Sequence, residues 1–169
     1  MSDSPLAPHN YALHQATLHL LNELFNGTPE SGGFMLNPGD PGMLEQLGRV
    51  SADVASTRNV EGLTTIAAHV DHVLYGISLL NRWANGEPEP WNDADWSQSW
   101  KRTNVTEDQW DDLRSRLRNG VEEWMGYVQE RTEWDHLAAC GTIASLAHSA
   151  YHLGAIRQIL ATQGMKPIA

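Results

Sequence analysis

The chain has 169 residues, 41% of them hydrophobic and 19% charged, which is enough for one buried core in a single domain covering residues 1–169. Eleven Lys and Arg against 21 Asp and Glu give a formal net charge of −10, so we expect neither nucleic-acid binding nor charge-driven attachment to an anionic membrane. We find no apolar run of the roughly 20 residues that span a bilayer and no signal core at the N-terminus, and the single cysteine, Cys140, fits a reducing cytoplasm.

The first third of the chain predicts a long helix, a loop and a shorter helical piece. A helix is expected over residues 10–25, where a stripe recurs at helical spacing before Asn26-Gly27 ends it. The stripe consists of Leu13, Thr17, Leu20 and Leu24. Residues 28–42 are dense in Gly and Pro and predict a surface loop. A helical piece interrupted by Gly48 is expected over residues 43–55.

A second long helix is predicted from Gly62 to Ala84, because its apolar residues share one face. That face consists of Leu63, Ile66, Val70, Val73, Ile77 and Leu80. After the breaker NGEPEP, the stretch 91–105 has no consistent period and predicts a loop or a short irregular helix. Its tryptophans, Trp91, Trp96 and Trp100, are candidates to line the mouth of a pocket or a partner surface.

Two further helices complete the predicted fold. Thr106 and Gln109 have the spacing of a capping box, and the apolar residues behind them alternate in steps of three and four, which is typical of a bundle seam. The seam consists of Trp110, Leu113, Leu117, Val121, Trp124 and Val128. The last helix is predicted from Thr142 to Gln163, ending at Gly164. Four long helices with a long connection between the second and third predict an all-α four-helix bundle.

Two histidines of the last helix, His148 and His152, are four residues apart and therefore point the same way from adjacent turns. Imidazoles at this spacing can bind one metal ion, although buried histidines with ordinary hydrogen bonds show the same pattern. His69 lies near the middle of the apolar face of the second helix and would supply a third imidazole. His72 is its competitor, as a ligand or as a supporting group, and the helical wheel favours His69.

The remaining candidates carry weaker signals. His9 is terminal, and His14 and His19 belong to the first helix, where His14 fits a boundary position better than a pocket. His136 is interpreted as loop or cap chemistry before the last helix. Cys140 favours inert packing over nucleophilic catalysis, since no pairing motif stands near it. No residue type or spacing identifies a general acid or base; Asp71, Glu133 and Asp135 are available carboxylates of unknown position.

The histidine pattern resembles a known family. A histidine within TIAAHVDHVLYG, followed after a long connection by HSAYHLGAIRQI, is similar to the DinB-like superfamily, which includes YfiT-type metal proteins and thiol-dependent transferases. The most specific part is H-x-x-x-H-x-G-x-I-R, matched by His148, His152, Gly154, Ile156 and Arg157. The resemblance implies a four-helix bundle, often dimeric, with zinc or nickel held by His69, His148 and His152.

Three functional hypotheses follow. The resemblance implies a metal-dependent transferase that joins a low-molecular-weight bacterial thiol to an electrophilic small molecule, and a metal-dependent hydrolase is its variant. A non-catalytic, stress-related bundle that binds a metal or small ligand is the second hypothesis. A homodimeric scaffold that has lost its metal is the third. Metal content separates the last hypothesis from the others, and thiol consumption separates the first two.

Overall fold

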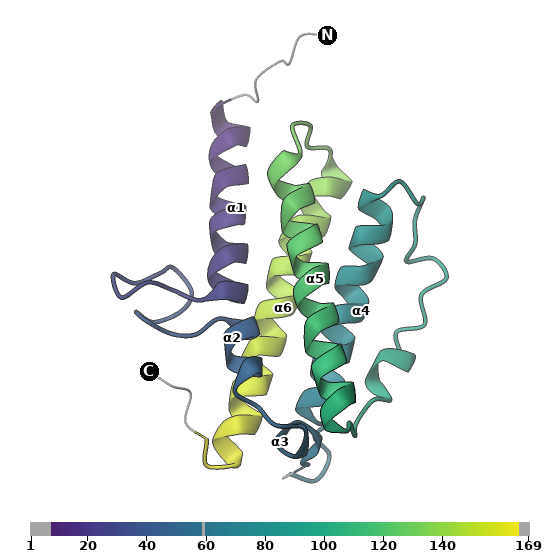
Figure 1. Ribbon diagram of the computed structural model, residues 1–169. Helices are drawn as coiled ribbons and strands as arrows, with labels where there is room; N and C mark the ends of the chain where they lie inside the picture. The colour runs from purple at the N-terminus through teal and green to yellow at the C-terminus, as the bar shows by residue number, and fades with distance from the viewer. Residues whose placement is uncertain (1–7, 59, 166–169) are drawn as a thin grey trace.

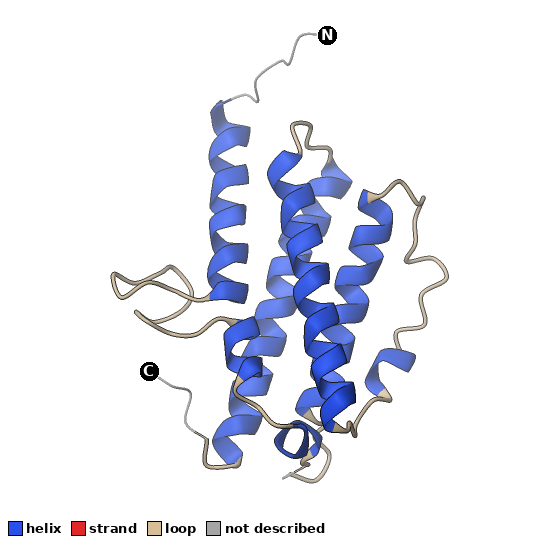
Figure 2. Ribbon diagram, viewed as in Figure 1, coloured by secondary structure: helices blue, strands red, loops and turns tan. Residues whose placement is uncertain are grey.

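The computed structural model describes residues 8–58 and 60–165. Its helices are α1 (Pro8–Asn26), α2 (Met43–Gly48), α3 (Ala52–Ser56), α4 (Ile66–Ala84), the single 3-10 turn η1 (Gln98–Trp100), α5 (Glu107–Glu130) and α6 (His136–Thr162). Over the described residues the chain consists of helices and loops, with no strand (Figure 2). The prediction of an all-α fold is confirmed.

The four long helices pack along one another (Figure 1). Helix α4 packs against α5 and α6, and α1 packs against α6 and α5. The short helices α2 and α3 contact α5 near one end, and the long α4–α5 connection brings η1 back onto α4. None of the described helices combines the length and apolar character needed to cross a bilayer.

Helix α5 supplies the seam that the sequence predicts. Thr106 caps its first turn, and the Gln109 side chain accepts a hydrogen bond from the Thr106 backbone N–H, which forms the predicted capping box. All six seam residues are at most 1% exposed. Both seam tryptophans satisfy their buried N–H groups: Trp110 donates to the Val50 carbonyl over 2.6 Å, and Trp124 donates to Ser145 Oγ over 3.0 Å. The seam therefore buries large side chains without leaving an indole N–H unpaired.

The Gly- and Pro-rich loop over residues 28–42 is held by the buried carboxylate of Glu23 and by an ion pair between Asp40 and Arg157. Glu23 accepts hydrogen bonds from the backbone N–H groups of three consecutive loop residues, at 2.5–2.9 Å. Arg157 of α6 pairs with Asp40 at 3.2 Å and donates to the Pro41 carbonyl over 2.9 Å. The arginine of the resemblance motif thus ties the loop to α6.

Two predicted helix starts are wrong. Helix α4 begins at Ile66 instead of Gly62, because the Thr65 side chain caps the Ala68 N–H. Gly62 takes a φ of +82°, and Leu63 is half-exposed outside the helix. Helix α6 begins at His136 instead of Thr142, since the Asp135 carboxylate accepts from the Ala138 N–H over 2.7 Å. His136 is consequently the first helical residue rather than part of a loop.

The buried stripe of α1 also differs from the predicted one. Leu13 is 56% exposed, whereas Thr17 and Leu24 are buried. The buried face continues through Leu21 and Phe25, so it is rotated from the predicted stripe by about one residue. The packing of α6 against α1 decides which of several adjacent apolar residues turns inward.

Candidate metal centre

Four histidines meet where α4 packs against α6. His69 and His72 are three residues apart on α4, and His148 and His152 come from adjacent turns of α6. Three of the rings are buried, and His148 is half-buried. The sequence predicted three of these residues as ligands and the fourth as their competitor, and the structure brings all four together.

Three of the four rings direct a nitrogen toward a common point: those of His72, His148 and His152. Each offers a ring nitrogen, and these nitrogens lie within 4.8 Å of one another. The two Nε2 atoms of His148 and His152 are 3.0 Å apart. Nitrogens bound to one zinc ion at about 2.0–2.1 Å stand about 3.3 Å from one another, so small side-chain rotations bring this group to coordination distance. Among the described residues, the trio thus fits a divalent ion.

His69 contacts the cluster from the other edge of His152. Its Nδ1 lies 2.8 Å from the Nδ1 of His152, whereas His148 faces the Nε2 of the same ring. The two nitrogens of an imidazole point in divergent directions, so one ion bound at His152 Nε2 does not lie between His152 and His69. The contact instead suits a hydrogen bond that orients His152. The role of His69 as a ligand stays a prediction.

The proton position on His72 follows from its neighbour Ser99. The Ser99 hydroxyl donates its single proton to the Trp96 carbonyl over 2.7 Å. Its oxygen therefore accepts from His72 Nδ1, which is 2.7 Å away. With the proton on Nδ1, the Nε2 of His72 carries a lone pair. This arrangement resembles the supporting hydrogen bonds that fix metal-binding histidines in their binding tautomer.

Burial keeps the four imidazoles in their neutral form near pH 7. Desolvation, together with the neighbouring His148 and His69, lowers the pKa of His72 to about 4. Desolvation and the three surrounding histidines lower the pKa of His152 to about 3. Desolvation also lowers the pKa values of His69 and His148. Neutral rings have the free lone pairs that coordination requires.

Two tryptophans of the α4–α5 connection cover the cluster. The Trp100 ring stacks on His72 at 4.2 Å between centroids and meets His69 edge-on at 5.4 Å. Trp96 lies 5.5 Å from His72 and 6.5 Å from His148. The sequence offered Trp91, Trp96 and Trp100 as candidates for a pocket mouth or a partner surface. Trp91 and Trp96 line a cavity beside His148, whereas Trp100 lies on the turn η1 against His72. Ser99, on the same turn, is a supporting residue that sequence reasoning missed.

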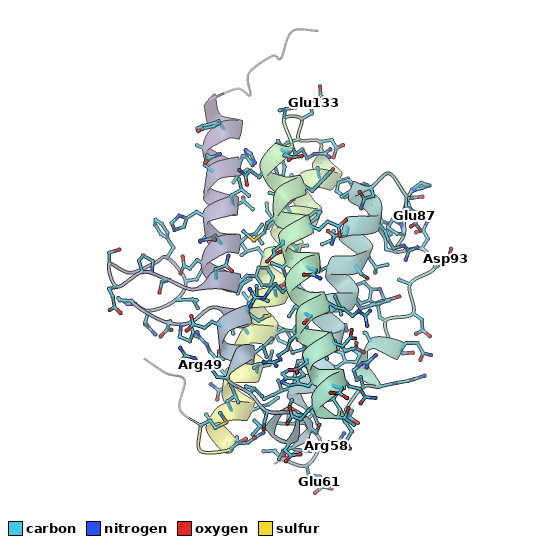
Figure 3. All side chains as sticks on the ribbon, in the orientation of Figure 1. Arg49, Arg58, Glu61, Glu87, Asp93 and Glu133 are labelled. Atoms are coloured by element: carbon cyan, nitrogen blue, oxygen red, sulfur yellow. The ribbon has the colours of Figure 1, made fainter. Side chains whose placement is uncertain are left out.

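The candidate carboxylates are engaged elsewhere or exposed. Asp71 pairs with Arg102 at 3.2 Å, and Asp135 caps α6. Glu133 extends from the α5–α6 turn at the end of the molecule (Figure 3). The ligand group found among the described residues contains only imidazoles.

The other histidines serve local contacts. His14 Nε2 donates to the Val128 carbonyl over 2.7 Å, which agrees with the boundary position predicted for it, although it also lines a small cavity beside Trp134. His19 lies 3.9 Å from Glu23. His136 lies beside Cys140, whose side chain is exposed rather than packed as predicted. The side chain of His9 lies outside the described residues.

The sequence matches no family model, and comparison with curated proteins and with solved structures gives no match. Function is therefore inferred from the geometry of this chain and from the resemblance of its motif.

Proposed function

We propose that the chain is a DinB-like four-helix bundle, formed by α1, α4, α5 and α6, that binds one divalent metal ion through His72, His148 and His152. The observation that carries this proposal is the convergence of three neutral imidazoles, two of which have supporting hydrogen bonds on their other nitrogen. Zinc or nickel suits a site built from imidazoles, whereas magnesium and calcium prefer oxygen ligands.

The proposed activity is transfer of a low-molecular-weight thiol to an electrophilic small molecule. Three protein ligands leave a coordination position open, and a divalent ion there supplies the Lewis-acid chemistry that lowers the pKa of a thiol or a water molecule. The chain's own residues orient and enclose the site: His69 and Ser99 hold two of the rings, and Trp100 shields His72 from water. When the thiol adds to an electrophilic carbon–carbon double bond, the S–H bond and the π bond break, a sulfur–carbon bond forms at one carbon, and the thiol proton is transferred to the neighbouring carbon.

Thiol consumption tests this activity. Zinc-loaded and metal-free protein are each mixed with several bacterial thiols and an electron-poor alkene, and the free thiol that remains is measured over time. We expect consumption above the buffer rate only with zinc, and none with zinc-treated His148→Gln. If no thiol is consumed in any combination although the metal binds, the transferase proposal is wrong and the bundle is a metal-binding protein without this activity.

A further inference from the structure

A cavity of about 210 Å³ adjoins the metal centre between α4 and α6. His148 lines it, and Trp91 and Trp96 of the α4–α5 connection close one side. In Figure 1 this connection runs along the outer side of α4, and its turn η1 contacts that helix. The cavity is distinct from the coordination point, because the Nε2 of His148 faces His152.

Two helical glycines keep this space open. Gly76 of α4 and Gly141 of α6 both line the cavity. A Cβ atom at Gly76 would lie 3.6 Å from Nδ1 and Cε1 of His148, and one at Gly141 would lie 3.6 Å from a Leu80 methyl group. Glycine is less favourable than alanine inside a helix, and neither position has a positive φ that demands it. The absence of side chains at these two positions therefore leaves volume to the cavity.

The walls of the cavity are apolar and uncharged. They include Ile77, Leu80 and the two indole rings, and no Asp, Glu, Lys or Arg is among its lining residues. An anion bound there would find no cation in the wall, and the net charge of −10 repels it further. A cation would lose its hydration without gaining a carboxylate. The composition of the wall therefore favours a neutral, flat ligand.

Two polar groups in the wall are available to such a ligand. Ser149 is 1% exposed, and its Oγ has no hydrogen-bond partner. The neighbouring Ser145 hydroxyl is already used, because it donates to the Thr142 carbonyl and accepts from Trp124. On His148, the Nδ1 edge faces Gly76 and remains free when Nε2 binds an ion. Buried polar atoms without partners are costly, so a rotation of the Ser149 side chain toward the cavity would give its Oγ a ligand oxygen as a partner.

We propose that this cavity binds a neutral single-ring aromatic compound that carries a hydroxyl or carbonyl group, with its ring against the tryptophans and its oxygen at Ser149. A cavity of about 150 Å³ accepts benzene, so the available volume suits one ring and a short substituent. The cavity and its lining are present without a metal ion, so this inference does not depend on the proposed function.

Ligand-observed NMR with phenol tests the proposal, on both metal-free and zinc-loaded full-length protein. A ligand of this size binds with a Kd of about 1 mM when it fills an apolar site. We expect phenol to bind both forms, and benzoate to bind the metal-free form at least about tenfold more weakly than phenol, because its charge has no partner in the cavity wall. Phenol binding to the metal-free form tests the cavity without any metal, so its outcome is independent of whether the proposed metal site and its activity are correct.

Two matched variants locate the binding. Gly141→Leu fills the cavity and is expected to weaken phenol binding more than about tenfold, whereas Gly154→Leu, on the exposed face of the same helix with open space around it, leaves binding unchanged. Ser149→Ala is expected to weaken phenol about fivefold and to leave toluene unaffected. Circular dichroism verifies that each variant is folded. Equal effects of the two glycine variants, benzoate binding as tight as phenol, or no phenol binding would each overturn the proposal.

Discussion

The identity of the third ligand gives the sharpest prediction at the metal centre. His69 and His72 both lie against His152, but only His72 shares a point with His148 and His152. We compare His72→Phe with His69→Phe, since phenylalanine keeps a flat ring in each position and can neither bind a metal nor form the hydrogen bond. His72→Phe removes a ligand, whereas His69→Phe removes a group that orients one.

The expected losses differ in size. Structural zinc sites with four ligands bind with about 10–16 kcal/mol, or about 2.5–4 kcal/mol per ligand, so losing His72 weakens binding roughly 10²- to 10³-fold. Losing a supporting hydrogen bond weakens it about 10- to 100-fold. The two expected losses of affinity overlap at about 100-fold, so a third variant, His69→Asn, is included. The asparagine amide lies near the position of the lost Nδ1 and is expected to recover part of the zinc affinity.

Competition with a chromophoric chelator measures the affinities, and the visible spectrum of the cobalt-substituted protein reports the ligand set. We expect His69→Phe to keep the cobalt spectrum of the unmodified chain and His72→Phe to change it. A changed spectrum in His69→Phe, together with an unchanged one in His72→Phe, would show that His69, His148 and His152 are the ligands and would refute the geometric reasoning.

Three further predictions concern the surrounding structure. Ser99→Ala removes the acceptor for His72 Nδ1 and should weaken zinc binding about tenfold in the same chelator assay, with the cobalt spectrum retained; full affinity would mean that Ser99 does not orient the ring. Burial raises the pKa of Glu23, but the three backbone N–H groups and His19 outweigh burial and lower the pKa overall. The ionised carboxylate therefore stabilises the fold fully above its ordinary pKa of about 4.3, and this stabilisation is lost as the pH falls through the lower pKa of the folded protein. Glu23→Gln should therefore cost about 2–3 kcal/mol in urea unfolding at pH 7 and less below pH 4, and a difference that grows toward acid pH would contradict the assignment. Leu117→Ala, at a fully buried seam position, should lower the free energy of unfolding by about 3–5 kcal/mol, and a loss below about 1 kcal/mol would place this residue outside the core.

The parts of the fold that were predictable have strong local signals. The α5 seam repeats apolar residues in steps of three and four behind a capping box, so its burial follows from the sequence alone. Helix α6 is apolar on several sides, so periodicity gives no sharp start, and its first turn depends on the Asp135 cap. Likewise, the inward face of α1 is set by its neighbours, because adjacent leucines offer more than one stripe.

The candidate site was predictable to the level of one helix face. The spacing of His148 and His152 places both rings on the same side of α6. His69 and His72, three residues apart, point within about 60° of each other, so the choice between them depends on how α4 is rotated against α6. Ser99 and Trp100 reach the cluster only through the long α4–α5 connection, which has no sequence period.

Metal content is the most direct test of the central claim that this histidine cluster is a metal centre. Protein purified without a histidine tag is incubated with zinc and dialysed, and its metal is measured by elemental analysis beside the double variant His148→Ala/His152→Ala. We predict one zinc ion per chain in the unmodified protein and none above background in the variant. Absence of stoichiometric zinc from the unmodified protein, or equal zinc in both proteins, would contradict the claim.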